Sequence, residues 1–327
     1  MDRTHPKGVS YLIKDKIVFR FFLRRTLWSI VVLLVVSFMS YTLIFIAPGD
    51  PATILIGKQT GRFPTPEQVA QFRAEYGLDK PLLVQYYNWL KQAVQGDLGQ
   101  SFRTGTSVFS EVRVRFGNTL LLVTVTMLVA IVLGIPSGLL AAWFKDTFLD
   151  RFIHALSMLA VAIPDFWLAF LLVLIFSIVL RWLPSHGIGS ARHLILPVIC
   201  LGLANIARLN RLTRSGLVGV EGEKYVLSAR AKGLTRRTAW IKHGFPNIAV
   251  PIVTLIFTLF SGAIAGTIII ENVFAWPGIG FYFVEAVNYR DLPVIQAMVA
   301  LYAAVFIAGN ILADIAYVII DPRIRLD

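Results

Sequence analysis

Uncharged stretches long enough to cross a bilayer alternate with polar segments along this chain. The first uncharged run, 27–47, has 21 residues, and a transmembrane helix needs about 20. Further apolar runs lie at 120–144, 152–180, 194–207, 248–270 and 292–320. Because only helices and closed barrels satisfy the backbone in lipid, the pattern predicts an all-α polytopic membrane protein with six transmembrane helices.

Two of these runs depart from the simple pattern. The run 194–207 has only 14 uncharged residues, so the fourth span reaches full length only if Arg208, Arg211 and Arg214 snorkel toward the interface. The third run contains Asp165 directly after Pro164, which places this carboxylate at a broken turn. Two interpretations of Asp165 stay open: a polar group lining a pathway, or a side chain that bonds backbone amides freed by Pro164.

Charges between the spans predict which side each segment faces. Residues 1–26 are polar and basic, and the connection 208–246 carries nine Lys or Arg and two acids. Basic loops favour the cytoplasm, so we expect both segments and the tail 321–327 there. The polar segment 48–115 is then an extracytoplasmic helical region. Residues 116–320 form the rest of the transmembrane core, with an apolar, turn-rich segment at 274–280 that suits an interfacial or re-entrant position.

The middle of the 208–246 connection predicts a helix, a turn and a second short helix. Residues 225–232 are good helix formers without Pro or Gly, and Gly233 suits the left-handed residue that follows a helix. A second helix is expected from Thr235 towards His243, with Pro246 closing it.

One face of the first of these helices carries two small residues next to a tyrosine. Tyr225, Ala229 and Gly233 are spaced four apart and therefore share a face, where another backbone or side chain can approach closely. A docking surface and a solvated basic loop are the two interpretations of this segment.

Composition agrees with a membrane protein. The 327 residues are 56% hydrophobic and 15% charged, whereas soluble domains average roughly 45–50% and about 25%. The net charge of +12 would suggest nucleic acid in a soluble protein, but in a membrane protein it is expected in cytoplasmic loops. We therefore expect membrane lipid, and no nucleic acid, as a partner.

No residue pattern for catalysis or metal binding occurs. The sequence has no P-loop, no HExxH and no CxxC, its five His are scattered, and Cys200 is its single cysteine. We expect no enzymatic activity, no cofactor and no metal site in this chain. Asn310 and Asp314 lie one helical turn apart, which favours interhelical hydrogen bonding over substrate contact.

The segment around Gly233 resembles the coupling loop of a known family, the permease subunits of ATP-binding-cassette (ABC) importers for peptides and nickel. That loop carries Glu-Ala-Ala, three residues, Gly, nine residues and Ile-x-Leu-Pro. Ala229, Gly233 and Pro246 match it, whereas Leu227 replaces the Glu, as is common in the peptide and nickel branch. Similar stretches at 48–51, 76–81, 96–99 and 321–325 extend the resemblance over residues 20–325.

This resemblance implies a type I ABC importer permease fold in the bacterial inner membrane, with both termini cytoplasmic. It implies a homologous second permease, two ATPase subunits that use ATP, and an extracytoplasmic solute-binding protein. In such complexes each ATPase receives one coupling helix, and its closure switches the pathway between inward-facing and outward-facing states. The residues expected to couple here are Glu223, Tyr225, Ala229, Arg230, Lys232 and Gly233.

The substrate expectation also rests on resemblance. Stretches at 180–189 and 266–296 are similar to nickel-importing permeases, so nickel is preferred and short peptides are the alternative. No set of His, Cys and carboxylates clusters in the spans, so nickel would cross as a small organic chelate. A secondary transporter using Asp165, or a channel, are the competing classes; no polar or Gly-rich filter for a channel is evident.

Overall fold

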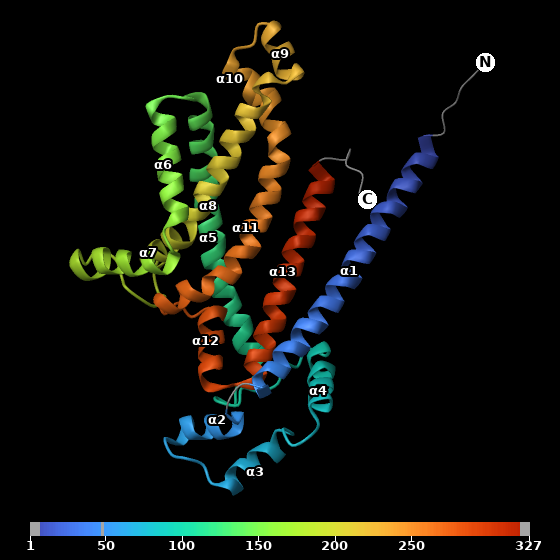
Figure 1. The fold of residues 1–327 in the computed structure, drawn as a ribbon, viewed down its shortest axis with the longest axis vertical. Coiled ribbons are helices and arrows are strands. Elements are labelled where there is room, and N and C mark those ends of the chain that lie inside the picture. Colours follow the sequence, from blue (N-terminus) through green and yellow to red (C-terminus); the bar gives the residue numbers. More distant parts are fainter. Residues whose placement is uncertain (1–6, 47–48, 321–327) are drawn as a thin grey trace.

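The computed structural model describes residues 7–46 and 49–320, except for the side chains of residues 7–22, 44, 314 and 316–320. Apart from one isolated bridge between Gln100 and Ser107, every regular element in this part of the chain is a helix. Long helices connect two ends of the molecule (Figure 1). One end carries α9 (Lys224–Ala231) and α10 (Arg236–Ala239); the other carries α2 (Pro51–Thr60), α3 (Pro66–Glu75) and α4 (Leu82–Val94).

Five of the described helices are individually long and apolar enough to cross a membrane. They are α1 (Lys7–Ile46), α5 (Val108–Trp143), α8 (Arg192–Gly219), α11 (Phe245–Val273) and α13 (Leu292–Ile320). The weakest predicted span, the fourth, is therefore confirmed as a helix of 28 residues. Its length includes Arg208, Arg211 and Arg214.

The third predicted span is not one straight helix. It consists of α6 (Phe148–Ala162), α7 (Asp165–Leu172) and the π-helix η1 (Val173–Val179), and the two halves meet at 100°. Ile163 and Pro164 are extended, with ψ of 123° and 134°. A residue before proline avoids the helical region, and proline has no N–H to continue the ladder. The break agrees with the broken turn expected at Pro164 and Asp165, and the pair counts as a sixth span only if both halves together cross the membrane.

Helices α5 and α8 approach each other closely because glycine replaces larger side chains at their interface. A methyl group on Gly134 would come within 2.9 Å of the Ile206 carbonyl oxygen, and one on Gly138 within 2.6 Å of the Asn210 carbonyl oxygen. Small residues at helix interfaces allow such close approach of the backbones. The main hydrophobic core extends from this interface to α11 and α13.

Helix α1 leaves the bundle along most of its length (Figure 1), and large apolar side chains such as Trp28 and Val32 are exposed. Hydrogen bonds attach it to the bundle near its C-terminal end. There Tyr41 Oη donates to Gln85 Oε1 on α4 at 3.0 Å, and Gln296 Nε2 on α13 donates to the Ser37 carbonyl at 2.8 Å. The exposed face is available to lipid or to another subunit.

Polar contacts hold the region between α1 and α5 against the other helices. Helix α3 begins with a capping box in which Thr65 and Gln68 bond each other's backbone. The buried Asp291 carboxylate accepts from Ser101 Oγ at 2.5 Å and Phe102 N at 3.0 Å. Burial raises the pKa of Asp291, and these hydrogen bonds oppose the rise. This carboxylate joins the loop before α5 to the turn between α12 (Ile279–Tyr289) and α13.

Candidate functional site

The α8–α11 connection folds as the sequence predicts, into a helix, a left-handed glycine and a second helical segment. Helix α9 spans Lys224–Ala231, and Gly233 has φ of +92°. The next segment starts with Thr235, whose hydroxyl oxygen accepts from Thr238 N at 3.3 Å. Lack of space does not explain the glycine at position 233, because a side chain there would meet no other atom within 4 Å. The left-handed conformation explains it, since glycine adopts that conformation without steric cost.

The second segment continues further than predicted. Helix α10 passes into the π-helix η3 (Trp240–Gly244) and then into α11, so Pro246 lies in the first turn of α11 rather than closing a helix. Proline is tolerated there because first-turn N–H groups have no helical partner. The expected stop at Pro246 is therefore wrong.

On the face of α9 predicted to dock a partner, Ala229 is buried in the chain itself, whereas Tyr225 and Gly233 are exposed. Val226 and Ala229 are 0% and 5% exposed and belong to the main hydrophobic core, together with Ala239 and Trp240. Tyr225 precedes Ala229 by four residues and shares its face of the helix, so Tyr225 lies beside the buried contact of Val226 and Ala229. Ala229 thus fixes α9 to its own chain, and it is not exposed for docking.

The outward face of α9 carries a different set of residues. Leu227 is 48% exposed and lies on the side of α9 away from the buried Val226 and Ala229. Ser228 and Ala231 lie beside Leu227 and are also exposed. Arg230, Lys232 and Gly233 are exposed on the flanks and at the end of α9, and Glu223 and Tyr225 are exposed at its start. Ile241 on η3 is 51% exposed. The site therefore offers an apolar centre with basic flanks, and sequence analysis missed Leu227 and Ile241.

Buried contacts tie this segment to the long helices. Trp240 is fully buried, and the Arg236 guanidinium lies 4.4 Å from its ring centre and 2.8 Å from Glu221 Oε1. A methyl group on Gly216 of α8 would come within 2.9 Å of Ile248 Cγ2 on α11. These contacts leave little room for α9 to move independently of α8 and α11.

A buried ion pair extends this attachment to α6. Arg214 Nε and Nη2 donate to the two oxygens of Asp150 at 2.5 and 2.6 Å. The Asp150 side chain is 4% exposed, and it also accepts from Asp146 N at 3.0 Å. Arg214 was expected to snorkel, but this bidentate pair holds it instead. Arg208 and Arg211 are exposed.

Asp165 stands at the first position of α7 and is exposed. It makes no hydrogen bond to any residue that the structure describes, so the amides near Pro164 do not hold it. Its charge interacts with that of Arg208 on α8. The pathway interpretation of Asp165 stays a prediction.

The predicted Asn310–Asp314 pair remains untested. Asn310 is partly buried on α13 and makes no hydrogen bond within the described part of the chain. The Asp314 side chain lies outside the described residues. Next to Asn310, α11 and α13 touch at Ser261 and Gly309, where no side chain larger than hydrogen fits.

Glu271 forms a buried polar centre that sequence analysis did not single out. It is 0% exposed in the last turn of α11. Its carboxylate accepts from Thr119 Oγ1 on α5 at 2.6 Å, and from Gly280 N and Phe281 N at 2.7 and 3.1 Å. The last two are orphan donors of the first turn of α12, so the carboxylate stabilises this helix N-terminus.

Comparison with known proteins decides the family. Residues 134–326 match the model described as "Binding-protein-dependent transport system inner membrane component", and residues 18–123 match its N-terminal counterpart. The chain belongs to this family. It is 38% identical to the oligopeptide transport system permease AppB of Bacillus subtilis, covering 93% of this chain and 99% of that one. It is 36% identical to the glutathione transport system permease GsiC of Escherichia coli K12, covering 93% and 98%.

A solved structure of the family fold agrees with the architecture. An inward-facing structure of the MetNI methionine ABC transporter matches 63% of this chain and 95% of its own with a TM-score of 0.50 and 16% identity. The predicted ABC importer permease fold is confirmed. A family member is a multi-pass membrane component of a transport system, and the family implies separate ATPase and solute-binding partners.

Proposed function

We propose that this permease is a membrane subunit of an ATP-driven importer of short peptides. The observation that carries the proposal is the full-length similarity to permeases named for oligopeptides and glutathione, which is itself a tripeptide. These relatives favour the peptide alternative over nickel, which we preferred on short stretches that both branches share. In this proposal, a homologous second permease completes the pathway, and a solute-binding protein delivers the peptide from outside.

The contacts of α9 support a mechanism for coupling. The outward face around Leu227 docks in a cleft of an ATPase subunit, with Arg230 and Lys232 on its flanks. Because Val226 and Ala229 are buried against the chain, a displacement of α9 moves α8 and α11 with it. Asp150–Arg214 and the Gly134–Gly138 contact pass this displacement to α6 and α5. ATP binding by the partners thereby biases the rigid-body alternation of the pathway.

The two polar ends of the molecule suit this assignment. Helix α9 lies at the end opposite α2, α3 and α4 (Figure 1), and its connection carries the basic excess expected of the cytoplasm. The opposite end then faces the binding protein. Asp165 and Arg208, exposed on neighbouring helices, are candidates for the pathway surface and its contact with peptide termini.

The proposal is tested by deleting this subunit in cells that lack other peptide importers. We expect uptake of radiolabelled trialanine to fall to background and to return with a plasmid copy, while uptake of radiolabelled nickel, with or without free histidine, stays unchanged. Lost nickel uptake with unchanged peptide uptake would overturn the peptide assignment and restore nickel. An uncoupler that abolishes peptide uptake at normal ATP levels would favour a secondary transporter.

A further inference from the structure

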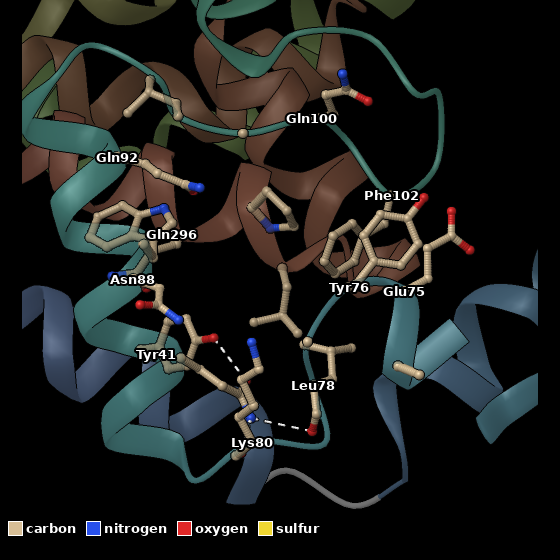
Figure 2. Close-up of a pocket in the computed structure, with 18 residues that line it drawn as sticks. Tyr41, Glu75, Tyr76, Leu78, Lys80, Asn88, Gln92, Gln100, Phe102 and Gln296 are labelled. Atoms are coloured by element: carbon tan, nitrogen blue, oxygen red, sulfur yellow. Dashed lines mark hydrogen bonds between the residues drawn. The ribbon is translucent and has the colours of Figure 1, made fainter. Parts of the chain in front are cut away.

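A cavity of about 470 Å³ lies at the end of the molecule opposite α9. It is an open cavity lined by α4, the turn between α3 and α4, the loop that precedes α5, and the start of α13 (Figure 2). Its volume falls in the range of roughly 300–1,000 Å³ that small-molecule sites occupy. No residue of the coupling segment or of the Glu271 centre lines it.

Two different walls face each other across this cavity. Asn88 and Gln92 of α4 lie on one side, and the rings of Tyr76 and Phe102 lie on the other (Figure 2). The two rings pack with centroids 4.4 Å apart, and Gln100 lies at the top edge. A carboxamide offers both donors and an acceptor, which matches a peptide unit, and the aromatic wall suits apolar side chains.

Opposite charges flank these walls. Glu75 lies beside the aromatic wall, and Lys80 lies at the lower edge of the cavity (Figure 2). Both residues are exposed, so their charged groups are free to meet a ligand. A short peptide carries an ammonium at one end and a carboxylate at the other, so one molecule complements both residues.

The floor of the cavity is already organised. Gln85 accepts from Tyr41 Oη at 3.0 Å and donates to the Lys80 carbonyl at 2.7 Å, which fixes the α3–α4 turn against α1. Gln296 is fully buried, and its Nε2 donates to the Ser37 carbonyl at 2.8 Å. Its Oε1 has no hydrogen-bond partner among the described residues, and neither has Trp89 Nε1. Both atoms are buried from solvent, so the polar contacts of the cavity come from its exposed carboxamides.

We propose that this cavity binds a free short peptide through its backbone and its two charged ends, as a receiving site on the permease outside the membrane pathway. The carboxamides of Asn88, Gln92 and Gln100 pair with the peptide amides, and Glu75 and Lys80 pair with the termini. The proposal rests on the proposed function for its substrate class. It assigns peptide contact to the permease itself, independent of the binding protein.

Equilibrium dialysis with radiolabelled trialanine tests this site in the purified full-length chain in detergent, without binding protein. We expect saturable binding of one peptide per chain, weakened about tenfold in Gln92→Leu, since the change removes one to two hydrogen bonds. Gln100→Leu, on a different element, should act alike. Gln71→Leu, an exposed carboxamide of α3 outside the cavity, should bind like the unaltered chain. Trialanine blocked by acetyl and amide groups should bind more weakly.

Three results would overturn the site: no saturable binding to the folded chain, equal binding by the unaltered chain and both cavity variants, or binding only when the binding protein is present. Thermal unfolding of each variant shows that it is folded. Absence of binding together with lost peptide uptake in the deletion strain would exclude the peptide site in the cavity and support the proposed function. Saturable binding with unaffected peptide uptake in the deletion strain would support the cavity site and overturn the proposed function.

Discussion

Gly280→Ala is expected to lower the free energy of unfolding by about 3 kcal/mol, at the upper end of overpacking costs. A methyl group at this position would come within 2.6 Å of Ile268 Cα and 3.0 Å of Glu271 Oε2. The first atom belongs to the backbone of α11, and the second accepts the hydrogen bonds that start α12. Relief of the clash therefore separates α12 from α11 and leaves buried donors without a partner, which adds to the cost.

Gly262→Ala in the neighbouring helix α11 is the matched control for this substitution in α12. A methyl group on Gly262 meets no atom within 4 Å, and alanine is favoured over glycine inside a helix by roughly 0.5–1 kcal/mol. Thermal unfolding of the purified chains in detergent should show a lower midpoint for Gly280→Ala and an unchanged or higher one for Gly262→Ala. Equal midpoints would show that the α11–α12 contact is looser than described.

Leu227→Asp is expected to reduce ATP hydrolysis stimulated by the loaded binding protein by roughly tenfold or more in the reconstituted complex. Leu227 is half-exposed at the centre of the outward face of α9, so a carboxylate there would be buried without a partner when the ATPase docks. The chain itself should fold, because the altered side chain leaves the core of Val226 and Ala229 intact. Peptide uptake should fall in parallel.

Two further variants separate docking from general damage. Leu227→Met keeps an apolar side chain and should retain stimulated hydrolysis. Val94→Asp makes a similar change at an exposed residue of α4, at the opposite end of the molecule, and should leave co-purification of the ATPase subunits unchanged, which Leu227→Asp should reduce. Normal stimulation in Leu227→Asp would exclude the outward face as the docking surface. A bulky residue at Ala229 is a poor probe, because it would disturb the chain's own core first.

The membrane spans could be predicted because uncharged length is a direct requirement of the bilayer. Five spans and the helix-Gly-helix connection follow from runs of apolar residues and from Gly233, whose left-handed conformation is a local property. The bend at Pro164 was signalled by the proline, but its 100° angle depends on how α7 packs against the other helices. Local sequence carries no information about that packing.

The direction of the docking face and the Glu271 centre could not be predicted, because both depend on packing between different helices. Spacing shows that Tyr225 and Ala229 share a face, but it does not say whether that face points to a partner or to the chain's own core. In the fold, Val226 and Ala229 join the same hydrophobic core as Trp240 of η3. Glu271 belongs to no local pattern in the sequence, because its partners Thr119 and Gly280 come from α5 and α12.

Uptake by proteoliposomes tests the central claim most directly. The complete complex is reconstituted with ATP sealed inside, and radiolabelled trialanine with binding protein is added outside. The account predicts accumulation of peptide that stops when a non-hydrolysable ATP analogue replaces ATP and that persists with a protonophore. Accumulation that proceeds without ATP hydrolysis and collapses with the protonophore would contradict it.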